Sequence, residues 1–188
     1  MGNVCTCAIV LLLAASASAN GATKSPVLSR NARGTTVIEI VQDAHKLHIA
    51  FELTGMDAVG FEHAARSDAD VDAINATMDT LQTPDAWLVA NADARCHLSF
   101  SSVTPHVFRI GEGHEGKGAA DKRADIDVEY IYECDVPQQL RAIEFNLIEQ
   151  FPRLRGVIVN ASLSSGPVQR LLSTPRATIQ LAGSVAPP

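Results

Sequence analysis

The chain has 188 residues and a net charge of −6, with 15 Lys and Arg against 21 Asp and Glu. Proteins that bind nucleic acids are usually basic, so this balance argues against that class. The basic residues are also scattered along the chain rather than massed in one segment.

The N-terminus has the pattern of a secretory signal peptide. Residues 4–15 form an apolar run, and Ala17-Ser18-Ala19 fits a small-residue cleavage site. The run is shorter than the roughly 20 apolar residues of a membrane span. No Lys or Arg precedes it, so a buried or disordered N-terminus is the alternative. We expect a signal peptide at 1–19, a flexible leader at 20–33, one domain at 34–183 and a tail at 184–188.

The first half of the domain predicts a hairpin and a helix. Residues 35–41 are β-branched and residues 47–53 alternate apolar with polar, which is typical of two strands joined by a turn. Ser67 is a suitable helix N-cap, and the helix after it should end at Pro84. Four apolar residues recur there at helical spacing: Val71, Ile74, Met78 and Leu81. We expect Trp87 and Leu88 to pack inward after this helix.

The second half is richer in strands. The pattern predicts strands at 96–103, 106–110, 126–134, 142–147, 157–163, 168–172 and 177–181. A Gly-rich charged loop occupies 111–120, Pro137 opens a short helical turn, and a brief helix covers 148–152. Together the elements predict an α+β fold in a single domain, with a mainly antiparallel β-sheet, one principal helix and one or two short helices.

Two cysteines remain after removal of the signal peptide. Cys5 and Cys7 lie in residues 1–19, whereas Cys96 and Cys134 lie in strand-like runs. An even count in a chain bound for an oxidising compartment favours a disulfide. The alternative is a pair of free thiols with a metal or redox role, although no C-x-x-C redox motif is present.

Residues 60–66, Gly-Phe-Glu-His-Ala-Ala-Arg, place an acid, an imidazole and a base at a strand-to-helix corner. Glu62 and His63 have the chemistry to ligate a metal or to form an acid–base pair. The structural alternative, which we favour, pairs Arg66 with Glu62 or with an aspartate of the helix's first turn. His63 would then bond the backbone.

The Gly-rich loop offers a second set of ligands. Its first six residues match G-x-G-x-x-G, but they carry two carboxylates and no helix start follows, so dinucleotide binding is not expected. Zinc accepts the oxygen and imidazole ligands of Glu112, His114 and Glu115, and His106 would join them if the flanking strands form a hairpin. Ordering a flexible loop costs entropy, so such a site would be weak. The alternative is a solvated loop.

Enzymatic signatures are missing from the sequence. It has no G-x-S-x-G nucleophile elbow and no H-E-x-x-H metal-protease motif. We therefore expect no catalytic activity.

The ordered segments resemble the ZrgA-like family of zinc-regulated periplasmic proteins, over about residues 34–181. The likeness is carried by residues 59–66, by the strand with Cys96, and by residues 124–130 leading to Cys134. Residues 148–154 and 157–160 also look alike. The resemblance implies a periplasmic protein that assists zinc acquisition without catalysis, beside a zinc transporter or its periplasmic binding protein.

The chain departs from the family at two ligand-rich places. Members look to carry a His-x-His-Gly motif before the first strand, where this chain has Asn31-Ala32-Arg33-Gly34. Their long His/Asp/Glu tract shrinks here to residues 111–122, with one histidine. We therefore expect weak or lost zinc binding. The candidate ligands are His106, Glu112, His114 and Glu115 in the loop, with Glu62 and His63 as a second cluster. The alternative is a structural or interaction module of the cell envelope that binds no metal.

Overall fold

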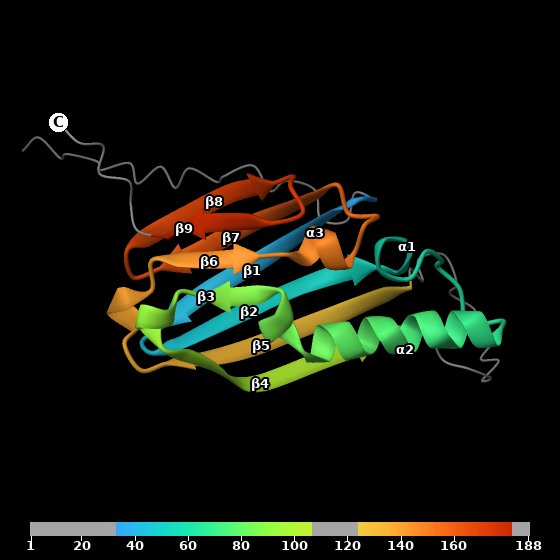
Figure 1. Cartoon of the computed structure of the whole chain (residues 1–188), viewed down its shortest axis with the longest axis horizontal. Coiled ribbons are helices and arrows are strands. Elements are labelled where there is room, and N and C mark those ends of the chain that lie inside the picture. The colour runs from blue at the N-terminus through green and yellow to red at the C-terminus, as the bar shows by residue number, and fades with distance from the viewer. Residues whose placement is uncertain (1–32, 107–123, 182–188) are drawn as a thin grey trace, which may run out of the picture.

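The structure is a computed structural model, and it describes residues 33–106 and 124–181. These residues form an α+β fold with two β-sheets, and most neighbouring strands are antiparallel (Figure 1). The predicted fold class is confirmed. The larger sheet has the order β4-β5-β2-β1-β7-β8. Its strands are β1 (Thr35–Asp43), β2 (Lys46–Thr54), β4 (Cys96–Pro105), β5 (Asp125–Cys134), β7 (Gly156–Leu163) and β8 (Gly166–Leu172).

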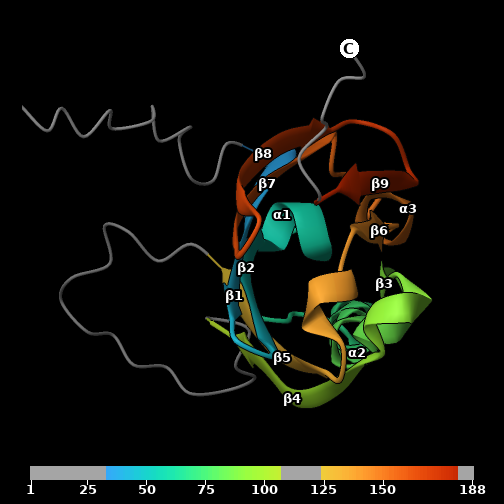
Figure 2. The same ribbon diagram turned by 90° about the vertical axis from the view of Figure 1, so that its left-hand side faces the viewer.

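The smaller sheet has the order β3-β6-β9. Its strands are β3 (Leu88–Ala90), β6 (Ala142–Phe145) and β9 (Ala177–Gln180). The α-helices of the described residues are α1 (Gly55–Ala58), α2 (Asp68–Gln82) and α3 (Leu147–Gln150), and short 3₁₀ turns cover Pro84–Ala86, Ala92–Ala94 and Pro137–Gln139. Figure 2 shows the larger sheet curving around the three helices and the smaller sheet, all of which lie on one of its faces.

The core lies between the two layers. On β1 and β2 the alternation of the sequence turns one set of side chains inward, so that Ile38 and Ile49 are fully buried. Trp87 is also fully buried, as predicted, and its ring meets that of Phe51 edge-on with centroids 6.0 Å apart. The Trp87 indole N–H donates to the carbonyl of Thr80, so its one polar atom is satisfied inside the core.

The hairpin and the capped helix predicted for the first half are confirmed. β1 and β2 form an antiparallel hairpin, and Ser67 caps α2 by accepting from the backbone N–H of Asp70 at 3.2 Å. The corner differs from the prediction, because the short helix α1 follows β2 directly. Residues 60–66 therefore join two helices and do not follow a strand. The predicted strand at 106–110 is also wrong at its first residue, since β4 ends at Pro105 and His106 lies beyond it.

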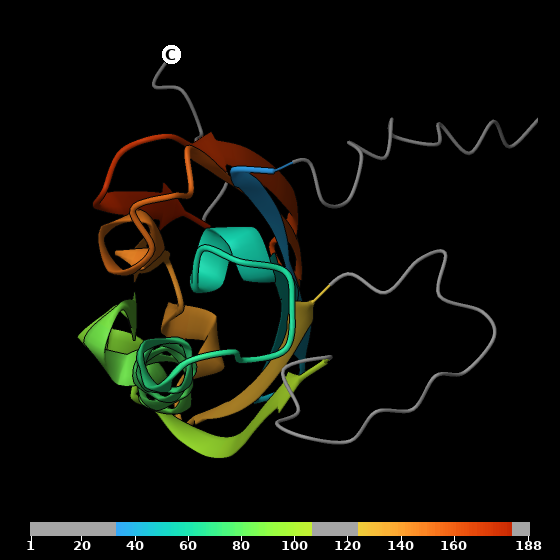
Figure 3. The ribbon, with the colours of Figure 1, turned by 90° about the vertical axis from the view of Figure 1, so that its right-hand side faces the viewer.

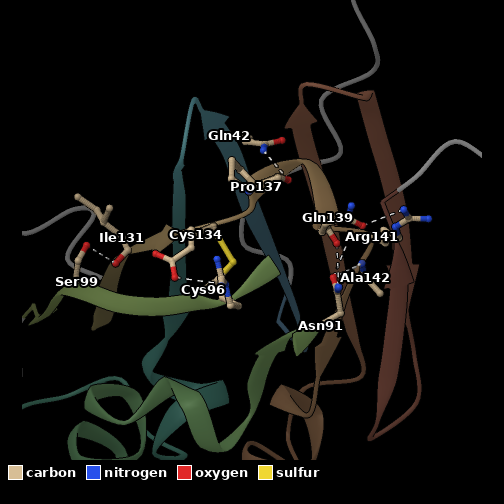
Figure 4. The surroundings of a disulfide bond; sticks show 12 residues. Gln42, Asn91, Cys96, Ser99, Ile131, Cys134, Pro137, Gln139, Arg141 and Ala142 are labelled. Carbon is tan, nitrogen blue, oxygen red and sulfur yellow. Dashed lines mark hydrogen bonds and ion pairs between the residues drawn. A yellow bond between two sulfur atoms is a disulfide. The ribbon is translucent and has the colours of Figure 1, made fainter. Parts of the chain in front are cut away.

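The disulfide is confirmed. Cys96 and Cys134 lie directly opposite each other on β4 and β5, and their sulfur atoms are bonded at 2.01 Å (Figure 4). Nearby, Asn91 accepts from the backbone N–H of Arg141 and donates to the carbonyl of Gln139. These bonds tie the chain before β4 to the chain before β6.

Several predictions fall on residues outside the described ranges. These are the signal peptide, most of the leader, the tail, and the loop ligands Glu112, His114 and Glu115. Within residues 33–106 and 124–181, no helix has the length and apolar character needed to cross a membrane.

Candidate functional site

The corner is built on α1, which closes one end of the space between the layers (Figure 3). Thr54, the last residue of β2, caps this helix by accepting from the backbone N–H of Asp57 at 3.2 Å. The chain leaves the helix through Gly60, whose φ of +93° favours glycine. The guanidinium group of Arg153 lies where a side chain on Gly60 would be. Thr54, which precedes the corner in the sequence, and Arg153, which follows it, therefore both help to hold it in place.

Glu62 has a partner that sequence reasoning missed. Its carboxylate forms an ion pair with Arg33 at 3.2 Å, and the Glu62 side chain is 23% exposed against 72% for Arg33. Arg33 is the last residue of the expected leader, 29 positions earlier in the chain. Nothing in the local pattern around residues 60–66 could have indicated it.

His63 is held in one orientation. Its ring stacks on Phe61 with centroids 4.7 Å apart, and its Nδ1 lies 2.9 Å from the carbonyl oxygen of Ala64. A carbonyl only accepts, so Nδ1 carries the hydrogen and the Nε2 lone pair is left for another group. The backbone bond that we expected for His63 is present.

Arg66 contributes through its backbone. Its N–H donates to Asp70 at 2.8 Å, and Asp70 in turn donates its own N–H to Ser67. This reciprocal arrangement resembles a capping box at the start of α2. The bond from Arg66 is the main reason that the pKa of Asp70 lies below its usual value, and the positive charge that His63 can carry acts in the same direction. Glu62, His63 and the backbone N–H of Arg66 therefore all have partners within the protein.

His106 lies just beyond the end of β4. Its Nε2 is 2.8 Å from Oδ2 of Asp127 on β5, and both side chains are about half exposed, at 49% and 58%. A carboxylate only accepts, so Nε2 donates and Nδ1 is the nitrogen available to a ligand. Sequence reasoning missed Asp127, although the alternation of β5 turns it away from the core, on the same face as Thr104.

The same end of the larger sheet carries both candidate clusters. The backbone N–H of His106 donates to the carbonyl of Asp125, and that of Gly55 donates to the carbonyl of Ala124. His106 and Ala124, the residues that flank the 107–123 segment, therefore lie close together beside α1. Glu62 pairs with Arg33, whereas His63 bonds the backbone of Ala64. The fold places His106 beside Asp127. Among the described residues, no group of three or more His, Cys, Asp or Glu side chains could hold a metal ion.

Comparison with known proteins identifies a family. The family model described as ZrgA family zinc uptake protein matches residues 31–181 of the chain. A search of curated proteins finds no match. The matched range spans every described strand and helix, including the corner, both cysteines of the disulfide and the pair of His106 and Asp127.

Proposed function

Because the chain belongs to the ZrgA family of zinc uptake proteins, we propose that it is an exported, periplasmic accessory protein of zinc uptake that catalyses no reaction. The observation that carries this proposal is the family match over nearly the whole domain. Zinc would be its cargo, held briefly and passed on, rather than a resident cofactor. The recipient would be a zinc transporter or the periplasmic binding protein that serves one.

The pair of His106 and Asp127 supports weak zinc binding beside the 107–123 segment. Histidines that ligate zinc commonly donate their other ring hydrogen to a carboxylate, which fixes the tautomer and makes the imidazole a better ligand. Asp127 meets His106 in this way at 2.8 Å. Zinc sites usually hold three or four protein ligands. We propose that Glu112, His114 and Glu115 supply the others, since the 107–123 segment that carries them directly follows His106 in the sequence.

Glu62 and His63 rank second as zinc ligands. The Nε2 atom of His63 is suitably presented, because Ala64 fixes the tautomer and Phe61 fixes the ring plane. Glu62 would first have to leave Arg33. A site here would therefore compete with an existing ion pair.

Calorimetry on the untagged mature protein at neutral pH tests the proposal. We expect zinc to bind in the micromolar-to-millimolar range and His106→Ala or His114→Ala to abolish most of the heat. His97→Ala is the matched control, because His97 lies at the opposite end of β4, about 30 Å away at the usual strand rise. Absence of bound zinc in this range would refute zinc binding. Loss of binding only in His63→Ala would move the site to the corner.

A second candidate is an envelope module of the same fold that binds no metal. It is favoured by the engagement of Glu62 with Arg33 and by the absence of a three-ligand group among residues 33–106 and 124–181. It predicts that substitution of all six histidines leaves growth under zinc starvation unchanged. The zinc-handling proposal predicts slower growth of that variant, so one growth comparison separates the two.

A further inference from the structure

The outer face of the larger sheet is uncovered by the described elements. The helices and the smaller sheet all lie on the opposite face, as Figures 2 and 3 show. On β1, for example, Ile38 and Ile40 are buried against that inner layer, while Glu39 between them is exposed. A sheet that buries one face commonly leaves the other to water, so exposure alone assigns no role.

This outer face contains an acidic hollow. Its volume is about 520 Å³, and the residues that line it include Glu39, Glu52, Asp127, Glu129, Ser102 and Thr104. Its lining among the described residues contains no Lys or Arg. The sheet register brings the carboxylates together, because Glu52 pairs with Asp127 across β2 and β5, and Ala50 lies between Glu129 and Glu39. Neighbouring strands are about 4.8 Å apart, so these negative charges reinforce one another.

A row of four side chains, three of them apolar, borders the hollow. Phe100 pairs with Ile131, Ile131 with His48, and His48 with Val41, across four adjacent strands. Phe100 is 46% exposed and Val41 is 48% exposed. Phe100 and Ile131 are neighbours on β4 and β5, so this end of the row offers an apolar contact beside the charged hollow. The row lies two residues along the strands from Glu129 and Glu39, which is about 7 Å.

We propose that this outer face binds a basic segment of a partner protein. The segment would place Lys or Arg side chains over Glu39, Glu52 and Glu129, with an apolar side chain against the neighbouring pair of Phe100 and Ile131. Complementary charge would select and orient the partner, whereas the apolar contact would slow its release. The proposal does not depend on zinc, because Glu39, Glu52 and Glu129 are outside the proposed metal site.

The binding test uses the synthetic peptide Leu-Ser-Lys-Ser-Lys-Ser-Lys, titrated into isotope-labelled protein in EDTA and followed by NMR. We expect shift changes at the backbone of Glu39, Ala50 and Glu129. The variant Glu39→Gln/Glu52→Gln/Glu129→Gln should weaken binding about tenfold, because three exposed charge pairs are lost. Replacing the leucine of the peptide by serine should weaken binding severalfold, and reversing its charges should abolish it.

A matched variant controls for net charge. Asp72→Asn, Asp79→Asn and Asp93→Asn together remove the same three charges from exposed positions away from this face. This triple variant should change the affinity less than about twofold. Equal weakening by both triple variants, absence of binding at millimolar peptide, or shifts confined to other surfaces would overturn the proposal.

A photo-crosslinking residue at position 50 identifies the occupant in producing cells, because Ala50 is exposed inside the hollow. The proposal expects a crosslink to another protein, at a segment in which Lys or Arg accompanies an apolar residue. A crosslink to residues 20–32 or 107–123 of the same chain, to a second copy, or to an acidic segment would refute it. Zinc calorimetry on the Glu→Gln triple variant should remain normal, so failure here leaves the proposed function untouched.

Discussion

Both carboxylate oxygens of Asp57 accept the backbone N–H of Gly34, at 2.9 and 3.0 Å. The same carboxylate accepts the hydroxyl of Thr54 at 2.9 Å, and Asp57 is only 3% exposed. Three parts of the chain therefore meet at one buried group: the residue before β1, the end of β2 and the helix α1. The corner at residues 60–66 follows α1 in the chain, so Asp57 anchors the helix on which the corner is built.

We expect Asp57→Ala to lower the free energy of unfolding by about 2–3 kcal/mol, because the buried N–H of Gly34 loses its acceptor. Asp57→Asn keeps one acceptor oxygen and should cost about 1 kcal/mol. Asp72→Asn, on the exposed side of α2, is the matched control and should stay within about 0.5 kcal/mol. Urea unfolding followed by Trp87 fluorescence measures all three. An Asp57→Ala protein as stable as the control would show that this junction contributes little.

Alanine substitutions at Gly60 and Gly166 distinguish the stability cost of backbone strain from that of side-chain crowding. Both have positive φ, at +93° and +115°, but a Cβ on Gly60 would lie 2.6 Å from an Arg153 nitrogen, whereas a Cβ on Gly166 would meet nothing within 4 Å. Each alanine substitution should cost about 1–2 kcal/mol through its φ. The Arg153 guanidinium can swing away, so we expect a difference below about 1 kcal/mol.

Denaturant unfolding of the two alanine variants and of Gly60→Ala/Arg153→Ala checks this. If Arg153 yields easily, removing it from the Gly60→Ala protein recovers little stability. A Gly60→Ala cost several kcal/mol above that of Gly166→Ala, relieved by Arg153→Ala, would show instead that Arg153 is rigidly held against the corner.

Local signals predicted much of the fold. The alternation of residues 47–53, the cap at Ser67 and the break at Pro84 depend on near neighbours, and the structure has the elements they indicate. The parallel pairing of β1 with β7 was not predicted, because Ile38 meets Val159 across more than a hundred residues and no local pattern encodes that choice. The helix α1 was missed because its four residues are too few to show a helical period.

The candidate site was less predictable than the fold. Residues 60–66 suggested that Glu62 and His63 act together, but their partners are Arg33 and Phe61. An ion pair between residues 29 positions apart depends on the tertiary fold. Asp127 likewise becomes a partner of His106 only because β4 and β5 pair in this register.

The disulfide should be a major source of stability. Cys96 and Cys134 are 38 positions apart, and cross-linking a loop of this length is worth about 4 kcal/mol in the chain-entropy model. We expect Cys96→Ser/Cys134→Ser to lose about that much in urea unfolding, and reduction of the native protein to have a similar effect. Thiol alkylation with and without reductant gives the control, since protein without residues 1–19, which carry Cys5 and Cys7, should react only after reduction. Unchanged stability after complete reduction would contradict the prediction.

Tyr130 and Tyr132 are the only tyrosines of the chain, and both should resist ionisation while the protein is folded. Burial raises the pKa of Tyr130 above its usual value, and burial followed by the hydrogen bond to Asp85 raises the pKa of Tyr132. In the unfolded chain both would ionise near pH 10. The folded state therefore binds more protons above that pH, so its stability is intact below about pH 10 and falls as pH rises further. We expect tyrosinate absorbance to appear together with the change in Trp87 fluorescence that reports unfolding.

Tyr132→Phe is the control, because it leaves Tyr130 as the single reporter and should show the same coincidence. Tyrosinate absorbance that rises near pH 10 while Trp87 fluorescence stays native would show that the two hydroxyls are open to water.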